Sequence, residues 1–454
     1  MSDTIRKGIA PAYLLLCLVV GGSVQGVWAN AFLQLVAIAV IAWAALDGQA
    51  APAPRRARQL GAIVAIALLL AAIQLVPLPP SLWTALPGRA AVAGGFALLG
   101  VSPGWLPLSL SPYDSVATLA TLLPPLAMLA AIIRLGCHSS WLALSVVAAT
   151  AAAVVLGVLQ VASPASAASP WYFYPISNFG VATGFFANSN HMATLLLVAV
   201  PFVAALGATA QGWTEDARKR GAGLAIVGGA LVVILVGLAL NGSLAGYGLV
   251  LPVTIASLLL IVRPRARWVR STALALGLLS LVSFVLLVAS PLNERLVDRG
   301  AATSLSTRQA MLGHSVEAYK TFGPAGSGLG TFRDVYRSFE QPSAVDRTFV
   351  NHAHNDYLEL AVEMGLPGIA LILLFLAWWG RALWQVGRSQ AFDQYAAAGA
   401  ISSAAILVHS LVDFPLRTAA VSALFATSLA LMIVSKRSVG SKTDLRPTRH
   451  LVIH

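Results

Sequence analysis

Apolar runs of about 20 residues, separated by short polar breaks, recur along the chain. A helix of about 20 apolar residues crosses the hydrocarbon core of a bilayer, so each run predicts a membrane-spanning helix. The first run is too long for the apolar part of a signal peptide and no small-residue cleavage site follows it, which predicts a retained helix. About twelve spans are predicted, near residues 9–28, 30–46, 60–78, 115–133, 141–161, 190–209, 221–240, 245–262, 271–290, 366–385, 395–412 and 418–434. The expected fold class is an all-α polytopic membrane protein.

Three of the segments between these spans are long enough to fold, at residues 79–114, 162–189 and 291–365. In the longest, apolar residues at helical spacing predict an amphipathic helix over residues 307–322, which the Gly-rich stretch 323–330 ends. The expected organisation is a bundle of nine spans, one large outer loop containing short helices, three final spans and a basic tail, at residues 1–290, 291–365, 366–434 and 435–454.

Composition supports a membrane protein, because 58% of the 454 residues are hydrophobic and 10% are charged, whereas soluble domains carry about 25% charged residues. The net charge of +12 would by itself suggest a nucleic-acid partner. The basic residues are instead scattered between the apolar runs. With a cytosolic N-terminus, 20 of the 29 Lys and Arg residues fall in cytosolic segments, as the positive-inside rule requires. The charge therefore predicts cytosolic termini and an outward-facing large loop, with the lipid bilayer as partner and no nucleic acid.

Neither cysteine nor histidine spacing predicts a metal site. Cys17 and Cys137 offer no disulfide framework and no Cys-based metal spacing. His352 and His354 are two residues apart, but a third close ligand is missing from the pattern. We therefore expect no metal and no cofactor.

The densest polar signal lies at residues 351–368. Asn355 or Asp356 can cap a short helix that runs to Gly365, after which the next span opens. His354 would then lie at the outer membrane face, where an imidazole can move a proton near neutral pH or donate to a phosphate. A polar cluster that only hydrates the loop explains the same residues, so the residues alone leave both interpretations open.

The run His354-Asn355, nine residues, Gly365, two residues, Gly368 resembles a signature of the bacterial O-antigen ligase and polysaccharide polymerase superfamily. In that family the signature closes the large periplasmic loop. Three other stretches are similar to the family's recurring segments: Arg308 with the helix and Gly-rich run up to 332, residues 184–193, and residues 409–416. The resemblance covers roughly residues 170–430.

The resemblance implies an inner-membrane glycosyltransferase that uses an undecaprenyl pyrophosphate-linked glycan as its donor. An acceptor hydroxyl would attack the anomeric carbon on the periplasmic side without a metal. The acceptor could be lipid A core, another lipid-linked glycan or a protein serine. Arg308 would hold the pyrophosphate, since a guanidinium presents paired donors and stays charged. His354 would either activate the acceptor or contact the phosphate.

One departure concerns the pyrophosphate site. Many family members carry an Arg after a Ser at the outer end of a middle span, where this chain has Leu244. We hypothesise that Arg417, Arg299 or Arg333 replaces it. The resemblance also favours substrate contacts for further residues near the membrane entries, namely Asn355, Asn188 and His352. His409 and Asp413, four residues apart, could pair within the bundle. Glu363 and Asp356 are alternative bases, although a helix-face carboxylate and a cap explain them more simply.

A twelve-span transporter of a polysaccharide precursor or a small solute fits the span count equally well. Transporters gather polar groups at the bilayer midplane on interrupted helices, whereas the spans here have apolar centres and the ionisable residues concentrate in one outer loop. A structural membrane subunit would leave the stretches around Arg308 and His354 unexplained.

Overall fold

The computed structural model describes residues 3–24, 27–50, 52–211, 216–262, 271, 275, 277–278, 299–340, 350–389 and 392–434. Within these ranges the fold is helical except for two two-residue strands. These are β1 (Pro77–Leu78) and β2 (Leu106–Pro107), which pair antiparallel. The expected all-α class is confirmed.

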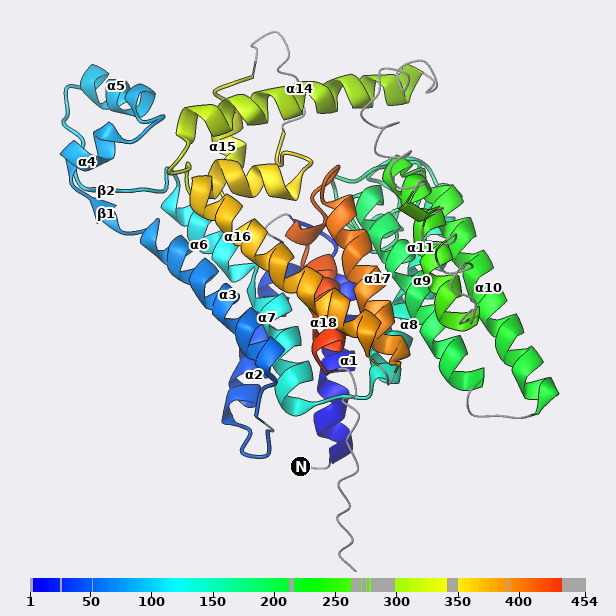
Figure 1. Cartoon of the computed structure of the whole chain (residues 1–454). Helices are drawn as coiled ribbons and strands as arrows, with labels where there is room; N and C mark the ends of the chain where they lie inside the picture. The colour runs from blue at the N-terminus through cyan, green and yellow to red at the C-terminus, as the bar shows by residue number, and fades with distance from the viewer. Residues whose placement is uncertain are drawn as a thin grey trace, which may run out of the picture.

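The bundle helices follow the apolar runs of the sequence (Figure 1). They are α1 (Asp3–Val20), α2 (Trp28–Leu46), α3 (Arg55–Ile73), α6 (Pro112–Ala120), α7 (Leu123–Ala130) with the π-helix η1 (Ala131–Leu135), α8 (Ser139–Val161), α9 (Ser189–Gln211), α10 (Ala217–Asn241), α11 (Leu244–Val262), α16 (Asp356–Arg388), α17 (Gln394–His409) and α18 (Ala419–Val434).

Seven helices in the described ranges are long and apolar enough to cross a membrane. This number supports a membrane protein, but the predicted count of twelve is not confirmed. The expected span at 271–290, apart from four residues, lies outside the described residues, as does the basic tail. Helix is present at the other predicted positions.

The core of the bundle is built around α9 and α18. Helix α9 packs against α8, α10, α11 and α17, while α18 packs against α1, α7 and α17. The apolar window of α9 is 83% buried and that of α3 is 17% buried. A helix that is apolar on all sides is stable only inside other helices or facing lipid, so the two helices mark the interior and the rim of the bundle.

One end of the bundle carries the shorter elements, with α14 (Arg299–Phe322) lying across it in Figure 1. The predicted amphipathic helix is present and ends at Phe322 as expected, but it begins earlier, at Arg299. The other elements here are α4 (Pro80–Ala85), α5 (Ala90–Leu98), α15 (Phe332–Tyr336) and a 3-10 turn, η3 (Pro415–Arg417).

A buried arginine joins two segments of this end. Arg89 donates hydrogen bonds to the carbonyls of Leu108 and Gly326, and its guanidinium lies over the rings of Trp83 and Phe322. Burial lowers the pKa of Arg89 to about 10. Carbonyls and aromatic faces compensate a guanidinium removed from water, so Arg89 fixes the α4–α5 region to the Gly-rich break after α14.

The same break supports a kink in α16. Gly365 has φ +62, a left-handed conformation that interrupts the helix and frees the carbonyls of Val362 and Glu363. Ser327 N donates to the first at 3.1 Å and Gly328 N to the second at 2.9 Å. Gln74 from the end of α3 donates to Glu363 O at 3.1 Å. The expected helix ending near Gly365 and the span after it are therefore two arms of one bent helix, and the expected boundary between residues 365 and 366 falls at the bend.

Candidate functional site

The site is built around a His354–Asp413 pair whose members are 59 residues apart in the chain. His354 Nδ1 lies 3.0 Å from Asp413 Oδ1. Asp413 is fully buried, whereas the His354 side chain is 23% exposed. A carboxylate can only accept, so His354 Nδ1 carries the proton and Nε2 of the neutral ring is left as an acceptor. The pair presents a partly exposed base held by a buried carboxylate.

The backbone at His354 is in the left-handed region, with φ 49. This conformation costs a residue with a side chain about 1–2 kcal/mol, so neighbouring contacts must hold it. After His354, the Asn355 side chain donates to Leu411 O at 3.0 Å and accepts from the Tyr357 and Leu358 amides. Of the two expected caps, Asn355 therefore caps α16.

The turn after α17 is fixed to the start of α16 by further hydrogen bonds. Asp356 N donates to Ser410 O at 3.0 Å, and Ser410 Oγ donates to Asp356 Oδ2 at 2.8 Å. Tyr357 Oη donates to Leu407 O at 2.7 Å. These contacts hold the segments that carry His354 and Asp413 in one register.

Three imidazole rings pack around the ring of Phe414. The centroid of the Phe414 ring lies 4.4 Å from the ring centroid of His352, 4.8 Å from that of His354 and 5.1 Å from that of His191. His191 stands in the first turn of α9 and is buried. The start of α9 therefore joins the site, as its match to a recurring family stretch suggested.

A cluster of three buried carboxylates surrounds Arg417. The guanidinium lies 3.6 Å from Asp356 Oδ1, 3.2 Å from Glu359 Oε1 and 3.3 Å from Glu363 Oε2. Burial alone would lower the pKa of Arg417, but the three carboxylates outweigh it and raise the pKa above its usual value. Arg417 thus serves as the counterion of this cluster, which leaves little of its charge for an anionic ligand.

Glu359 links that cluster to the site. Its Oε1 lies 2.8 Å from His352 Nδ1, and its Oε2 accepts from Ala353 N at 2.9 Å. Both partners directly precede His354. Sequence reasoning assigned no role to Glu359, although Asp356, Glu359 and Glu363 have the three- and four-residue spacing that places side chains on one helical face.

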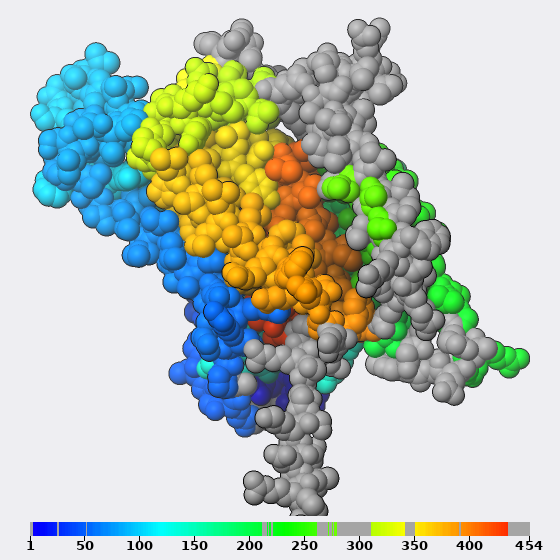
Figure 2. Space-filling model, viewed as in Figure 1, coloured from blue at the N-terminus to red at the C-terminus, as the bar shows by residue number. Residues whose placement is uncertain are grey.

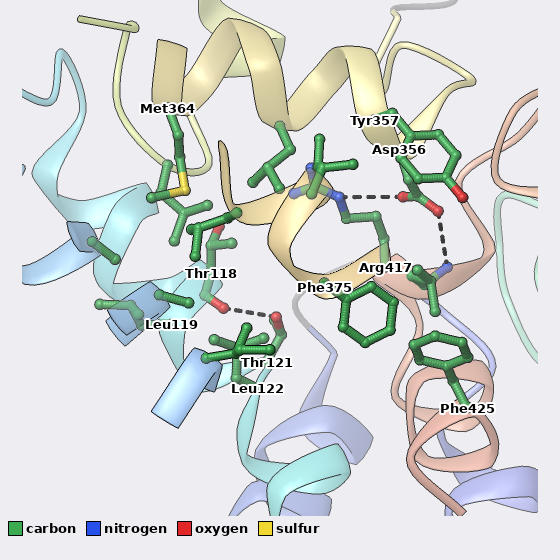
Figure 3. A pocket seen from close by; sticks show the side chains of 18 of the residues that line it. Thr118, Leu119, Thr121, Leu122, Asp356, Tyr357, Met364, Phe375, Arg417 and Phe425 are labelled. Carbon is green, nitrogen blue, oxygen red and sulfur yellow. Dashed lines mark hydrogen bonds and ion pairs between the residues drawn. The ribbon is translucent and has the colours of Figure 1, made fainter. Parts of the chain in front are cut away.

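A cavity of about 390 Å³ opens on the other side of α16 (Figure 3). Apolar side chains from α3, α6, α16, α17 and α18 line most of it, among them Ile63, Leu119, Leu360, Leu407 and Phe425. Asp356 and Arg417 form its polar edge. In the space-filling view, α16 forms a continuous part of the molecular surface below α14 (Figure 2).

The remaining predicted residues are spread over the same end of the bundle. Arg299 and Arg308 belong to α14, but their side chains lie outside the described part. Arg333 is 47% exposed and lies 3.4 Å from Asp334, so it is on the surface. Asn188 accepts from Asn190 N at 2.8 Å at the start of α9.

His409 and Asp413 are not on one helix, because α17 ends at His409. His409 Nδ1 lies 2.9 Å from Thr194 Oγ1 of α9, whereas Asp413 faces His354. At the position where many family members carry an Arg, Leu244 begins α11. The preceding Ser243 donates to Asn190 Oδ1 at 2.7 Å. Among the residues whose structure is described, no group of three or more His, Cys, Asp or Glu side chains is arranged to hold a metal ion. Metal independence stays a prediction.

The model of a protein family described as O-antigen ligase matches residues 229–373. The matched range includes α14, the Gly-rich break, His354 and the kink at Gly365. No curated protein matches the chain.

Proposed function

We propose that the chain is a membrane glycosyltransferase of the O-antigen ligase and polysaccharide polymerase superfamily, a proposal supported by the match of residues 229–373 to the O-antigen ligase family model. It moves a glycan from undecaprenyl pyrophosphate to an acceptor hydroxyl. The reaction takes place on the periplasmic face of the inner membrane, at the end of the bundle that carries α14. The observation that carries this proposal is the pair formed by His354 and Asp413, a partly exposed base with a buried orienting carboxylate.

In the proposed step, His354 Nε2 takes the proton of the acceptor hydroxyl as the oxygen attacks the anomeric carbon. The bond between that carbon and the pyrophosphate oxygen breaks, and the pyrophosphate leaves with the electron pair. Asp413 holds Nδ1–H and stabilises the imidazolium that forms. Positioned bases of this kind contribute about 10²–10⁴-fold to a rate, and the dyad supports a role for His354 as base rather than as a simple phosphate ligand.

Arg308 stabilises the leaving pyrophosphate. Arg308 lies on α14, which packs against α16. His354 and Asn355 directly precede the first residue of α16. A guanidinium aimed at developing negative charge is worth about 3–4 kcal/mol of barrier lowering in a partly dehydrated site. Arg417 is the weaker candidate for this role, since three carboxylates already surround it.

The cavity beside α16 accommodates part of the prenyl chain of the donor. Part of its apolar lining comes from α3 and α16, which are long and apolar enough to span a membrane. Its polar edge at Asp356 lies two residues from His354. A lipid chain in this cavity would therefore extend from the reaction site into the bilayer.

The test incubates the purified protein in EDTA with a lipid-linked oligosaccharide and, separately, lipid A core, a second lipid-linked chain and a serine-containing protein. Transfer to one acceptor class, lost in His354→Ala and kept in His314→Ala, would support the proposal and assign the acceptor. His314 is a suitable control because it bonds Tyr336 on α15, 3.2 Å away, and does not contact the dyad.

Three outcomes would contradict the proposal: turnover that requires a metal, full activity of His354→Ala, or no transfer together with proton-coupled solute uptake by the reconstituted protein. The last would favour the transporter.

A further inference from the structure

Glu359 is buried to 1% exposure and so is almost closed off from solvent. Its two oxygens instead hold the chain just before His354, Oε1 through the His352 ring and Oε2 through the Ala353 amide. Arg417 neutralises the carboxylate and lies 3.2 Å from Oε1, the oxygen that also contacts His352. A buried ionised carboxylate persists only when it is paired and hydrogen-bonded, and these three contacts meet both conditions.

Glu359 holds residues 352 and 353, which directly precede the strained backbone at His354. His354 keeps φ 49, and this turn brings its ring to Asp413. Residues after His354 are fixed by the Asn355 and Asp356 hydrogen bonds to Leu411 and Ser410. The polar contacts described for residues 352 and 353 go to Glu359. Without the contacts to Glu359, residues 352 and 353 would no longer be held in place before the strained turn.

We propose that Glu359 is a positioning residue for His354, with His352 and Arg417 as its supports. This inference rests on the proposed function and assigns His352 a structural task in place of the predicted substrate contact. Glu359 moves no proton to substrate; it keeps the left-handed turn at residue 354 formed, so that Nδ1 stays on Asp413 and Nε2 faces the acceptor.

The test compares Glu359→Gln with Glu363→Gln. Gln removes the negative charge and offers one acceptor oxygen where Glu359 has two, so with Ala353 N on that oxygen the His352 contact survives only if the ring proton moves to Nε2 and the Gln amide donates to Nδ1. Glu363 is a matched control, because it lies one turn further along α16, is equally buried and contacts Arg417, but its side chain makes no described contact with residues 350–355. Thermal unfolding of both variants monitors folding.

In the transfer assay, Glu359→Gln is expected to lower kcat 10- to 100-fold with donor KM unchanged, whereas Glu363→Gln stays within about threefold of the wild type. In a His354→Ala background, Glu359→Gln should add no further loss. An additive loss in the double variant, or equal losses from both Gln variants, would overturn the inference.

A second readout does not depend on transfer. The rate at which diethyl pyrocarbonate modifies His354 is followed by mass spectrometry as a function of pH. The profile of Glu359→Gln should coincide with that of Asp413→Asn, and that of Glu363→Gln with the wild type. A wild-type profile in Glu359→Gln would refute the positioning role even if no acceptor were found, and a shifted profile without any transfer would leave the positioning role in place while refuting the proposed reaction.

Discussion

Replacing Asp413 by Asn tests the central pair directly. Asn keeps the shape of the side chain and removes its charge. Its amide can also donate to His354 Nδ1, which would place the ring proton on Nε2 and leave no base facing the acceptor. The surrounding hydrogen bonds at Asn355, Asp356 and Ser410 do not involve the Asp413 side chain, so the fold should survive.

The size of the effect follows from the distance between Nδ1 and Oδ1. For unit charges 3.0 Å apart, Coulomb's law with an effective dielectric constant of about 20 gives about 5 kcal/mol. The His354 side chain is 23% exposed, and solvent screening reduces this figure by roughly half. A loss of about 2–3 kcal/mol of imidazolium stabilisation corresponds to a fall in kcat of about 100-fold.

The measurement is steady-state transfer from a lipid-linked oligosaccharide in EDTA, with donor KM and thermal unfolding determined on the same preparations. The expected result for Asp413→Asn is a lower kcat with donor KM and unfolding temperature close to the wild type. Activity within about threefold of the wild type in a folded Asp413→Asn protein would refute the assignment of His354 as an oriented base.

Three further substitutions test separate parts of the structure. Arg308→Ala should lower transfer at least 100-fold in the same assay, since one well-placed donor at a developing charge is worth 10²–10³; near-normal transfer would exclude it from the pyrophosphate site. Arg417→Ala should destabilise the protein by about 3–5 kcal/mol because it leaves buried carboxylates unpaired. If the folded fraction of this variant still transfers the glycan, Arg417 is not the replacement for the missing family arginine. Gly365→Ala should lower the unfolding temperature, because a Cβ at φ +62 would collide with the Pro324 carbonyl. The control is Gly380→Ala on the same helix, where nothing lies within 4 Å of the added Cβ. Equal shifts of the unfolding temperature in both variants would contradict the role of the kink.

Local patterns predicted local structure well. The sequence predicted three local features: the cap at Asn355, the end of α14 at Phe322 and the break at Gly365. Each depends on residues within one or two helical turns. The number of membrane crossings was not confirmed in the same way, since an apolar run shows that a helix can enter a bilayer but not whether it crosses it.

The partners within the site could not be read from the sequence. Asp413 was expected to pair with His409, and its amide does donate to the His409 carbonyl at 3.0 Å; its side-chain contact with His354 is one that no spacing in the sequence indicates. Arg417 was one of the hypothesised replacements for the missing family arginine, and folding surrounds it with three carboxylates from α16 that its position in the sequence did not indicate.

The sequence by itself determined that the chain is helical with apolar runs long enough to cross a membrane, because run length and composition are properties of the linear chain. Its His-Asn to Gly-x-x-Gly motif also indicated His354 as a candidate for proton transfer or phosphate contact. Only the tertiary structure decided how His354 is oriented, since Asp413 lies 59 residues away and reaches it through packing of the turn after α17 against the start of α16. Helical spacing puts Glu359 on one face of α16 with Asp356 and Glu363, but only folding brings His352, Ala353 and Arg417 to its carboxylate.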